Sequence, residues 1–212
     1  MDRLQVDVFF ADTTKTDFEA LLTEYKEQLE QDRIVRIERA NNPGRKKELA
    51  AAGVLLHKVL KMYGRKSKDV LLTKEGKPYL KDDKLCFNIS HSGSMVMLAV
   101  SEDQIGADIQ KAVEYKASLY ERITSDAEKN QEELKDLKRL WAAKEGYSKL
   151  TGKGISVDFS TITVIEKETD FCIYDGNELK AYGKRVYEDE NYAAIVCMEE
   201  PFDVRKTETI SL

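Results

Sequence analysis

The sequence has little of what marks disulfide-rich, zinc-binding or membrane-spanning proteins. Its 3 cysteines, Cys86, Cys172 and Cys197, are odd in number and widely spaced, so they predict neither a disulfide framework nor a zinc motif. No run of residues approaches the roughly 18 apolar positions that a membrane span needs. The N-terminus has no basic lead before an apolar segment, so we expect no signal peptide. These absences favour a protein of the reducing cytoplasm with no membrane partner.

Proline is also scarce, with 3 residues in 212, and neither sign of charge dominates. The composition is 42% hydrophobic and 34% charged, which is typical of a globular domain with a solvated surface rather than of a disordered chain. The net charge of −5 argues against a nucleic-acid partner, although a local basic site for a phosphorylated ligand remains compatible with it. The length suits one compact domain or two small halves.

Hydrophobic periodicity predicts strands and helices in the order β, αα, βββ, and then the same order again. The expected strands are 4–10, 70–73, 85–89, 95–100, 105–109, 161–165, 171–174, 180–186 and 193–198, and the expected helical segments are 17–39, 46–62 and 117–150. We therefore predict an α/β (α+β) fold of two similar halves, a pseudo-dimer. Each half has a small, mainly antiparallel sheet with packed helices.

The predicted boundary between the halves divides the chain into residues 1–103 and 104–212. A ligand site is expected in the cleft between them. Two halves within one chain would make a monomer sufficient, so we expect a monomer.

Two oxygen-bearing side chains, Asp108 and Gln110, come at the end of an apolar strand. Residues two apart in a strand point to the same face, and carboxylate and amide oxygens suit a hard cation such as Mg²⁺. A solvated aspartate at a strand end is the alternative interpretation.

A predicted helix carries Trp141, Glu145 and Lys149, spaced four residues apart and therefore on one face. Such a pair of charges commonly forms only a surface salt bridge, which is the alternative here. Beside Asp108, however, the two carboxylates could share a Mg²⁺ ion and the lysine could meet its phosphate ligand.

Further polar residues could bind phosphate. Ser90 and His91 lie among small residues just after a strand, where hydroxyl, imidazole and backbone N–H groups can all donate to phosphate; a turn histidine bonded to nearby backbone is the alternative. Basic residues cluster at 45–47, which includes Lys46, and again between 58 and 68, although such runs are usually solvated. His57, within an apolar helical run, is interpreted as structural or surface.

Four short motifs, in this order, resemble those of the Sfp-type 4′-phosphopantetheinyl transferases. The family shows G-K-P, F-N-I/L-S-H-S/T, I/V-G-x-D and W/F-x-x-K-E-A/S-x-x-K. The matches here are Gly76-Lys77-Pro78, residues 87–92, residues 105–108 and residues 141–149. Gly146 stands where Ala or Ser is usual. The matched region covers about residues 75 to 155, and the resemblance implies the 4′-phosphopantetheinyl transferase fold.

The resemblance also implies an activity: transfer of the 4′-phosphopantetheine arm of coenzyme A to a serine of an apo acyl or peptidyl carrier protein, with release of 3′,5′-ADP. This would make the chain an enzyme of the holo-acyl-carrier-protein synthase type. Asp108 and Glu145 would hold Mg²⁺, with Gln110 as a further ligand in place of the glutamate of many members. Glu145 would be the base and Lys149 would bind the pyrophosphate.

The remaining implied contacts are with coenzyme A. Ser90 and His91 would contact its phosphates, Lys77 and Pro78 would line the adenine pocket, and Lys46 would lie near the 3′-phosphate.

Two other classes of protein stay open. One is a relative that binds coenzyme A or a carrier protein without transfer, for which Gln110 is the only hint. The other is an adaptor protein whose charged helices bind partners.

Overall fold

The computed structural model describes residues 3–114, 117–130, 136–154 and 157–212. Its helices are α1 (Phe18–Tyr25), α2 (Gln31–Arg39), α3 (Pro43–Met62), α4 (Ala117–Ile123) and α5 (Leu137–Thr151), with 3-10 turns η1 (Lys26–Gln28), η2 (Ser67–Asp69), η3 (Glu128–Asn130) and η6 (Phe159–Thr161). Its strands are β1 (Leu4–Asp12), β2 (Val70–Leu72), β3 (Pro78–Leu80), β4 (Cys86–Ser92), β5 (Met95–Ser101), β6 (Gly106–Lys111), β7 (Ile162–Lys167), β8 (Asp170–Asp175), β9 (Glu178–Glu188), β10 (Tyr192–Met198) and β11 (Phe202–Thr209).

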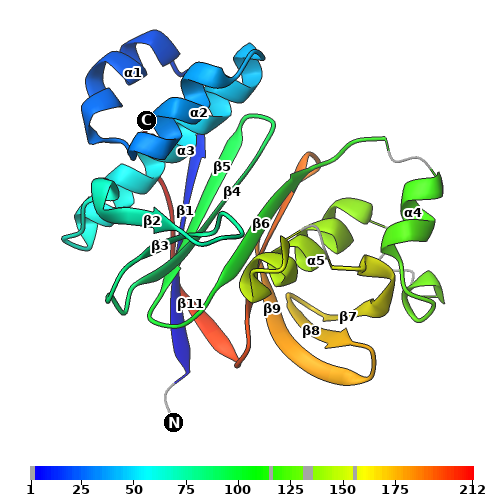
Figure 1. Cartoon of the computed structure of the whole chain (residues 1–212). Coiled ribbons are helices and arrows are strands. Elements are labelled where there is room, and N and C mark those ends of the chain that lie inside the picture. Colours follow the sequence, from blue (N-terminus) through cyan, green and yellow to red (C-terminus); the bar gives the residue numbers. More distant parts are fainter. Residues whose placement is uncertain (1–2, 115–116, 131–135, 155–156) are drawn as a thin grey trace.

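The first sheet has the strand order β11-β1-β5-β4, and α3 packs against β1, β4 and β5 (Figure 1). Helix α3 begins at a strong start signal, because the Asn42 side chain accepts the N–H groups of Gly44 and Arg45 and Pro43 occupies the first turn. Its buried face includes Leu55, Leu56 and Leu60.

The second sheet has the order β6-β10-β9-β8-β7, and α5 covers β6 and β10 (Figure 1). Asp136 caps the start of α5 by accepting the N–H of Lys138. The helix ends at Gly152, whose φ of 72° is the left-handed conformation that glycine adopts readily.

The two sheets repeat one strand order. In the first, β1 pairs with β5 and β5 with β4; in the second, β6 pairs with β10 and β10 with β9, all antiparallel. In each case a helix follows the first strand and packs on the sheet. The predicted α+β class with mainly antiparallel sheets is confirmed. The boundary at 103/104 falls in the connection between β5 and β6 and stays a proposal.

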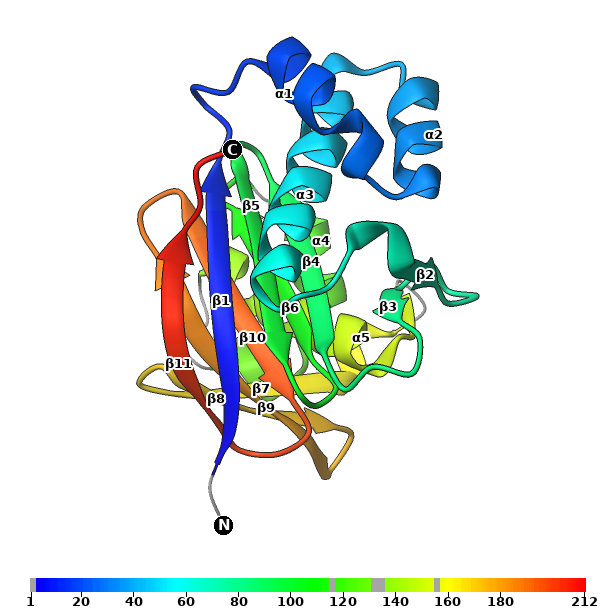
Figure 2. The same cartoon turned by 90° about the vertical axis from the view of Figure 1, so that its left-hand side faces the viewer.

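Strand β11 was not predicted, and it links the end of the chain to its beginning. It runs parallel to β1 in the first sheet (Figure 2). The buried carboxylate of Asp7 in β1 accepts from Arg205 Nε of β11 at 2.8 Å and from the Tyr63 hydroxyl. The C-terminal segment therefore belongs to the sheet of the N-terminal half. An apolar cluster that includes Val6, Ile109 and Phe202 joins both sheets.

Other differences from the predicted elements are local. The segment predicted as one helix over 17–39 is α1, η1 and α2, because Leu29 and Glu30 are extended. The segment predicted as helical over 117–150 contains α4, η3 and α5, while its part at 131–135 lies outside the described residues. No helix in the described part of the chain is long and apolar enough to cross a lipid bilayer.

Candidate active site

Polar side chains on one face of β4 tie this strand to β6. Asn88 Oδ1 accepts the backbone N–H of Ala107 at 3.0 Å, and Ser90 Oγ donates to Asp108 Oδ1 at 2.6 Å. Ser92 forms a similar bond further along. Alternate strand residues point the same way, so the spacing of this motif holds the edges of two sheets together.

Helix α5 lies close against β6, and a glycine makes this possible. A Cβ at Gly106 would lie 2.0 Å from the Gly146 carbonyl oxygen and 2.4 Å from the Leu150 nitrogen. These are backbone atoms that could not move without displacing the helix. At Gly146, a Cβ would lie 3.0 Å from Cys197 Sγ. The tight packing against Cys197 therefore explains why glycine, rather than the usual Ala or Ser, fits at this position.

The close approach brings Lys149 of α5 to Asp108 and Ser90. Lys149 Nζ lies 2.6 Å from Asp108 Oδ1 and 2.9 Å from Ser90 Oγ. Asp108 is 5% exposed, and its second oxygen, Oδ2, is buried with no hydrogen-bond partner among the described residues. A buried carboxylate oxygen left in this way is a functional signal, because such groups are normally satisfied.

Glu145 lies one turn before Lys149 and is half-buried. Burial and the nearby Asp108 carboxylate raise the pKa of Glu145, while Lys149 lowers it. Glu145 and Trp141 also line a pocket of about 500 Å³ that includes Leu119 of α4 and Phe159. The carboxylate therefore lies between the Asp108 cluster and an open cavity.

The donors fit a magnesium ion that retains water and substrate ligands. Within the described residues, no group of three or more His, Cys, Asp or Glu side chains is placed to hold a metal. Mg²⁺, however, is commonly bound through one or two carboxylates, with waters and phosphates completing the octahedron. The unpartnered Asp108 Oδ2 and the neighbouring Glu145 supply two. Gln110 follows on the same face of β6, and its amide donates to the Lys111 carbonyl at 3.3 Å, which leaves its oxygen available.

His91, at the end of β4, contacts α3 through Arg45 and Glu48. Arg45 Nη1 lies 2.9 Å from His91 Nε2, and Glu48 Oε2 lies 3.4 Å from Nδ1. Burial lowers the pKa of His91; Glu48 opposes this, while Arg45 and Lys149 add to it. The site is therefore electropositive and suited to an anion.

Two arginines of α2 lie nearby, and the sequence did not single them out. Arg33 is buried and paired with Glu30 at 3.0 Å, so it is Arg36 that adds to this charge. Burial, Arg33 and Arg45 lower the pKa of Arg36, which places the three guanidinium groups near one another. Lys46 is exposed, and the structure shows Arg45 rather than Lys46 in contact with His91. The basic run at 45–47 was visible in the sequence. Which of its residues faces His91 depends on how α3 is rotated against β4, and the sequence did not show this.

Lys77 and Pro78 line a pocket of about 200 Å³ together with Lys149 and Ile89. Lys77 Nζ donates to the carbonyl oxygens of Ile105 and Leu150, each at 3.3 Å, and burial lowers its pKa. The structure thus brings the first and last of the four motifs to one cavity.

Lys144 is one motif residue that faces away from the site. It is fully buried, and its Nζ lies 2.6 Å from Glu128 Oε2. The carbonyl oxygens of Ile123, Phe159 and Ile162 also lie 2.6 to 2.8 Å from Nζ, so its three N–H groups are shared among four acceptors. The spacing alone did not distinguish this structural lysine from Lys149.

Comparison with known proteins shows which family the segment carrying this site resembles. Residues 104–197, which carry Asp108, Glu145 and Lys149, match the model of the 4′-phosphopantetheinyl transferase superfamily. The predicted resemblance of the chain to Sfp-type members of that superfamily is therefore confirmed.

Individual relatives agree with the family match. The chain is 29% identical over 131 residues to 4′-phosphopantetheinyl transferase gsp of Aneurinibacillus migulanus, which covers 58% of this chain and 53% of the relative. It is 31% identical over 136 residues to 4′-phosphopantetheinyl transferase Sfp of Bacillus subtilis (strain 168), covering 59% and 61%. The chain thus spans about two fifths to three fifths of the length of the curated relatives it matches.

Proposed function

We propose that this chain transfers the 4′-phosphopantetheine arm of coenzyme A to a serine of an apo acyl or peptidyl carrier protein, as an enzyme of the holo-acyl-carrier-protein synthase type. The observation that carries the proposal is the cluster of Ser90, Asp108 and Lys149 beside Glu145, with a buried carboxylate oxygen that has no partner among the described residues. The names of the relatives support the same activity.

In the proposed reaction, the serine hydroxyl oxygen of the carrier protein attacks the β-phosphorus of coenzyme A. A new O–P bond forms, the bond to the bridging pyrophosphate oxygen breaks, and 3′,5′-ADP leaves. Glu145 accepts the hydroxyl proton, since its raised pKa makes it a stronger base than an ordinary glutamate. Lys149 stabilises the negative charge that develops on the leaving group.

When bound, Mg²⁺ would neutralise charge on the phosphoryl oxygens, and Asp108, Glu145 and Gln110 would hold it. Arg36, Arg45 and His91 would bind the 3′-phosphate, and Lys46 remains a candidate at the edge of this group. Lys77 and Pro78 would contact the adenine. They line the same pocket as Lys149, which would bind the pyrophosphate of the same ligand.

The proposed activity is tested by mass spectrometry of an apo carrier protein incubated with the chain, coenzyme A and Mg²⁺. We expect the mass of one phosphopantetheine to be added by the parent and not by Asp108→Asn, which keeps the side-chain shape but removes the charge. An unmodified carrier protein with the parent chain, tested over several carrier proteins, would instead support a relative that binds without transfer.

A second prediction concerns the 3′-phosphate. His91→Ala and Arg45→Ala should weaken binding of coenzyme A by at least about tenfold and binding of dephospho-coenzyme A much less, because hydrogen bonds to charged groups contribute about 1.5–3 kcal/mol. Isothermal titration calorimetry with both ligands measures the difference. Lys47→Ala is the matched control, since Lys47 Nζ lies over the Phe18 ring instead. Equal losses for both ligands would contradict the placement.

A further inference from the structure

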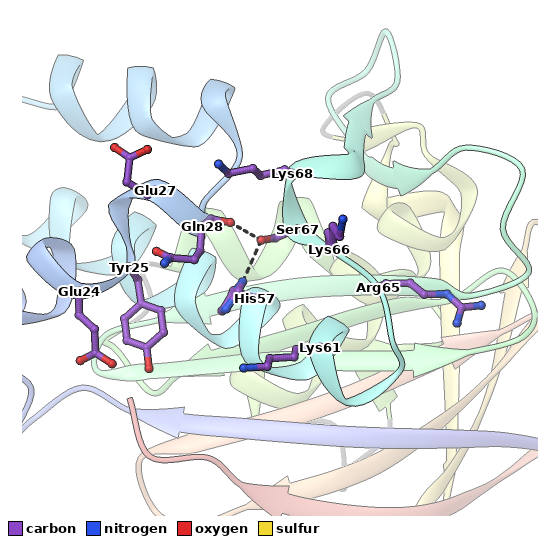
Figure 3. A pocket seen from close by; sticks show the side chains of 10 residues that line it. All are labelled: Glu24, Tyr25, Glu27, Gln28, His57, Lys61, Arg65, Lys66, Ser67 and Lys68. Atoms are coloured by element: carbon purple, nitrogen blue, oxygen red, sulfur yellow. Dashed lines mark hydrogen bonds between the residues drawn. The ribbon is translucent and has the colours of Figure 1, made fainter.

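A second pocket lies between the end of α1, α3 and the η2 turn, away from the candidate active site (Figure 3). Its volume is about 740 Å³, within the range of roughly 300 to 1,000 Å³ typical of small-molecule sites. His57, one of its lining residues, lies about three turns, or ~18 Å, further along α3 than the Arg45 that contacts His91. The four motifs contribute none of its lining residues.

One wall of this pocket carries positive charge that no ion pair compensates. Lys61 extends from α3, and Lys66 and Lys68 come from the segment that follows it (Figure 3). Among the residues that the structure describes, none of these three lysines forms a salt bridge, whereas the neighbouring Arg65 is paired with Asp83 at 2.7 Å. Three cations without an ion pair around one cavity favour an anionic ligand, even though the chain as a whole has a net charge of −5.

Hydrogen bonds at the base of the pocket fix the tautomer of His57. Ser67 Oγ donates its one proton to the Gln28 carbonyl oxygen, which can only accept. The contact between Ser67 Oγ and His57 Nδ1, at 3.2 Å, must therefore have the histidine as donor (Figure 3). In the neutral ring Nε2 is then an acceptor, and it becomes a donor to an anion only when His57 takes up a proton.

The charges around His57 make this protonation dependent on a ligand. Burial, Lys61 and Lys58 lower the pKa of His57, while Glu30 raises it. A bound anion would offset the lysines and favour the imidazolium form. Protonation and anion binding should therefore strengthen each other, with tighter binding at lower pH.

The opposite wall decides between two kinds of anion. Glu24 and Glu27 line it, with Tyr25 between them, and the centroid of the Tyr25 ring lies 5.8 Å from that of His57 (Figure 3). An extended acidic peptide crossing the pocket would pass these carboxylates and be repelled. A compact anion can instead bind beside Lys61, Lys66 and Lys68 without approaching Glu24 and Glu27. We propose that this pocket is a second anion site, which takes a small phosphoryl-bearing ligand between Lys61 and Lys68 and over His57.

The two histidines of the chain, His57 and His91, allow the proposal to be tested in the intact protein by NMR. The imidazole resonances are followed while inorganic pyrophosphate is added at low ionic strength in the absence of metal. We expect a saturable shift of the His57 resonance and an increase in its pKa with pyrophosphate. Titration of His91 reports independently on binding at the candidate active site, so the two sites are distinguished even if the proposed transferase activity is wrong.

Charge-matched variants supply the control. K61Q/K68Q should weaken pyrophosphate binding and raise the Kd reported by His57 at least about tenfold, because both charges lie beside the ligand. K81Q/K167Q, which removes two exposed lysines that do not line this pocket, should leave it unchanged. The proposal is wrong if His57 responds no more than to sodium chloride of equal ionic strength, if K61Q/K68Q titrates like the parent, or if hexaglutamate shifts His57 and pyrophosphate does not. The last result would indicate a protein-docking surface.

Discussion

Glu145→Gln should lower the turnover of phosphopantetheine transfer by at least about a hundredfold, because general-base help is typically worth 10²- to 10⁴-fold. The melting temperature should change little, since no hydrogen bond or ion pair of the Glu145 side chain is found among the described residues. Single-turnover kinetics with a carrier protein measure the first effect and thermal unfolding the second. Glu200→Gln, at an exposed position, is the matched control.

The pH dependence of the reaction tests the same assignment. Glu145 must be ionised to accept a proton, so activity should be lost as the pH falls through its pKa. Burial and Asp108 raise this pKa, so at limiting Mg²⁺ the acid limb of the kcat/KM profile should lie at higher pH than for a free glutamate, whereas saturating Mg²⁺ should lower it because a bound cation favours the carboxylate. Lys149 lowers the pKa, so Lys149→Gln should move the limb to still higher pH. If the limb does not move and Glu145→Gln turns over at a near-parental rate, Glu145 and Lys149 have no catalytic role and form only a salt bridge.

Lys144→Met should destabilise the protein by about 3–5 kcal/mol, because it leaves the buried Glu128 carboxylate without its counter-charge. Three backbone carbonyls lose their donor as well. This is a large share of the roughly 5–15 kcal/mol by which domains are stable. Urea unfolding measures it as a lower midpoint at unchanged slope.

The same substitution five residues later is the control for Lys144. Lys149→Met removes the counter-charge of the buried Asp108, but Lys149 is half-buried and Ser90 still donates to that carboxylate, so it should cost less stability than Lys144→Met while reducing transfer. The double variant K144M/E128L should recover only part of the loss. Its buried charge is gone, but the N–H groups of Ser125 and Val164 lose the Glu128 oxygens that accept them. Equal destabilisation by Lys144→Met and Lys149→Met would contradict these distinct roles.

Most strands and the long helix α3 could be predicted, because their signals are local. Alternation along β4 and β6 lies within the strands it specifies, and apolar periodicity predicted the helix over 46–62. The Asn42-Pro43 signal was not used as a helix start, so the predicted helix began three residues after Pro43, where α3 begins. Strand β11 has exposed positions at its end, and its stability comes from β1, almost the whole chain away. Such a pairing leaves no periodic signal within the strand itself.

The candidate site divides in the same way. Residue type and spacing by themselves determined that Asp108 and Gln110 share a strand face and that Glu145 and Lys149 share a helix face, since these relations follow from the backbone period alone. Only the tertiary structure decided which neighbours each side chain meets. It placed Arg45 rather than Lys46 at His91, turned Lys144 into the core, and brought α5 onto β6 over Gly106. Those outcomes depend on how separate elements pack in space, which the period of any one element does not encode.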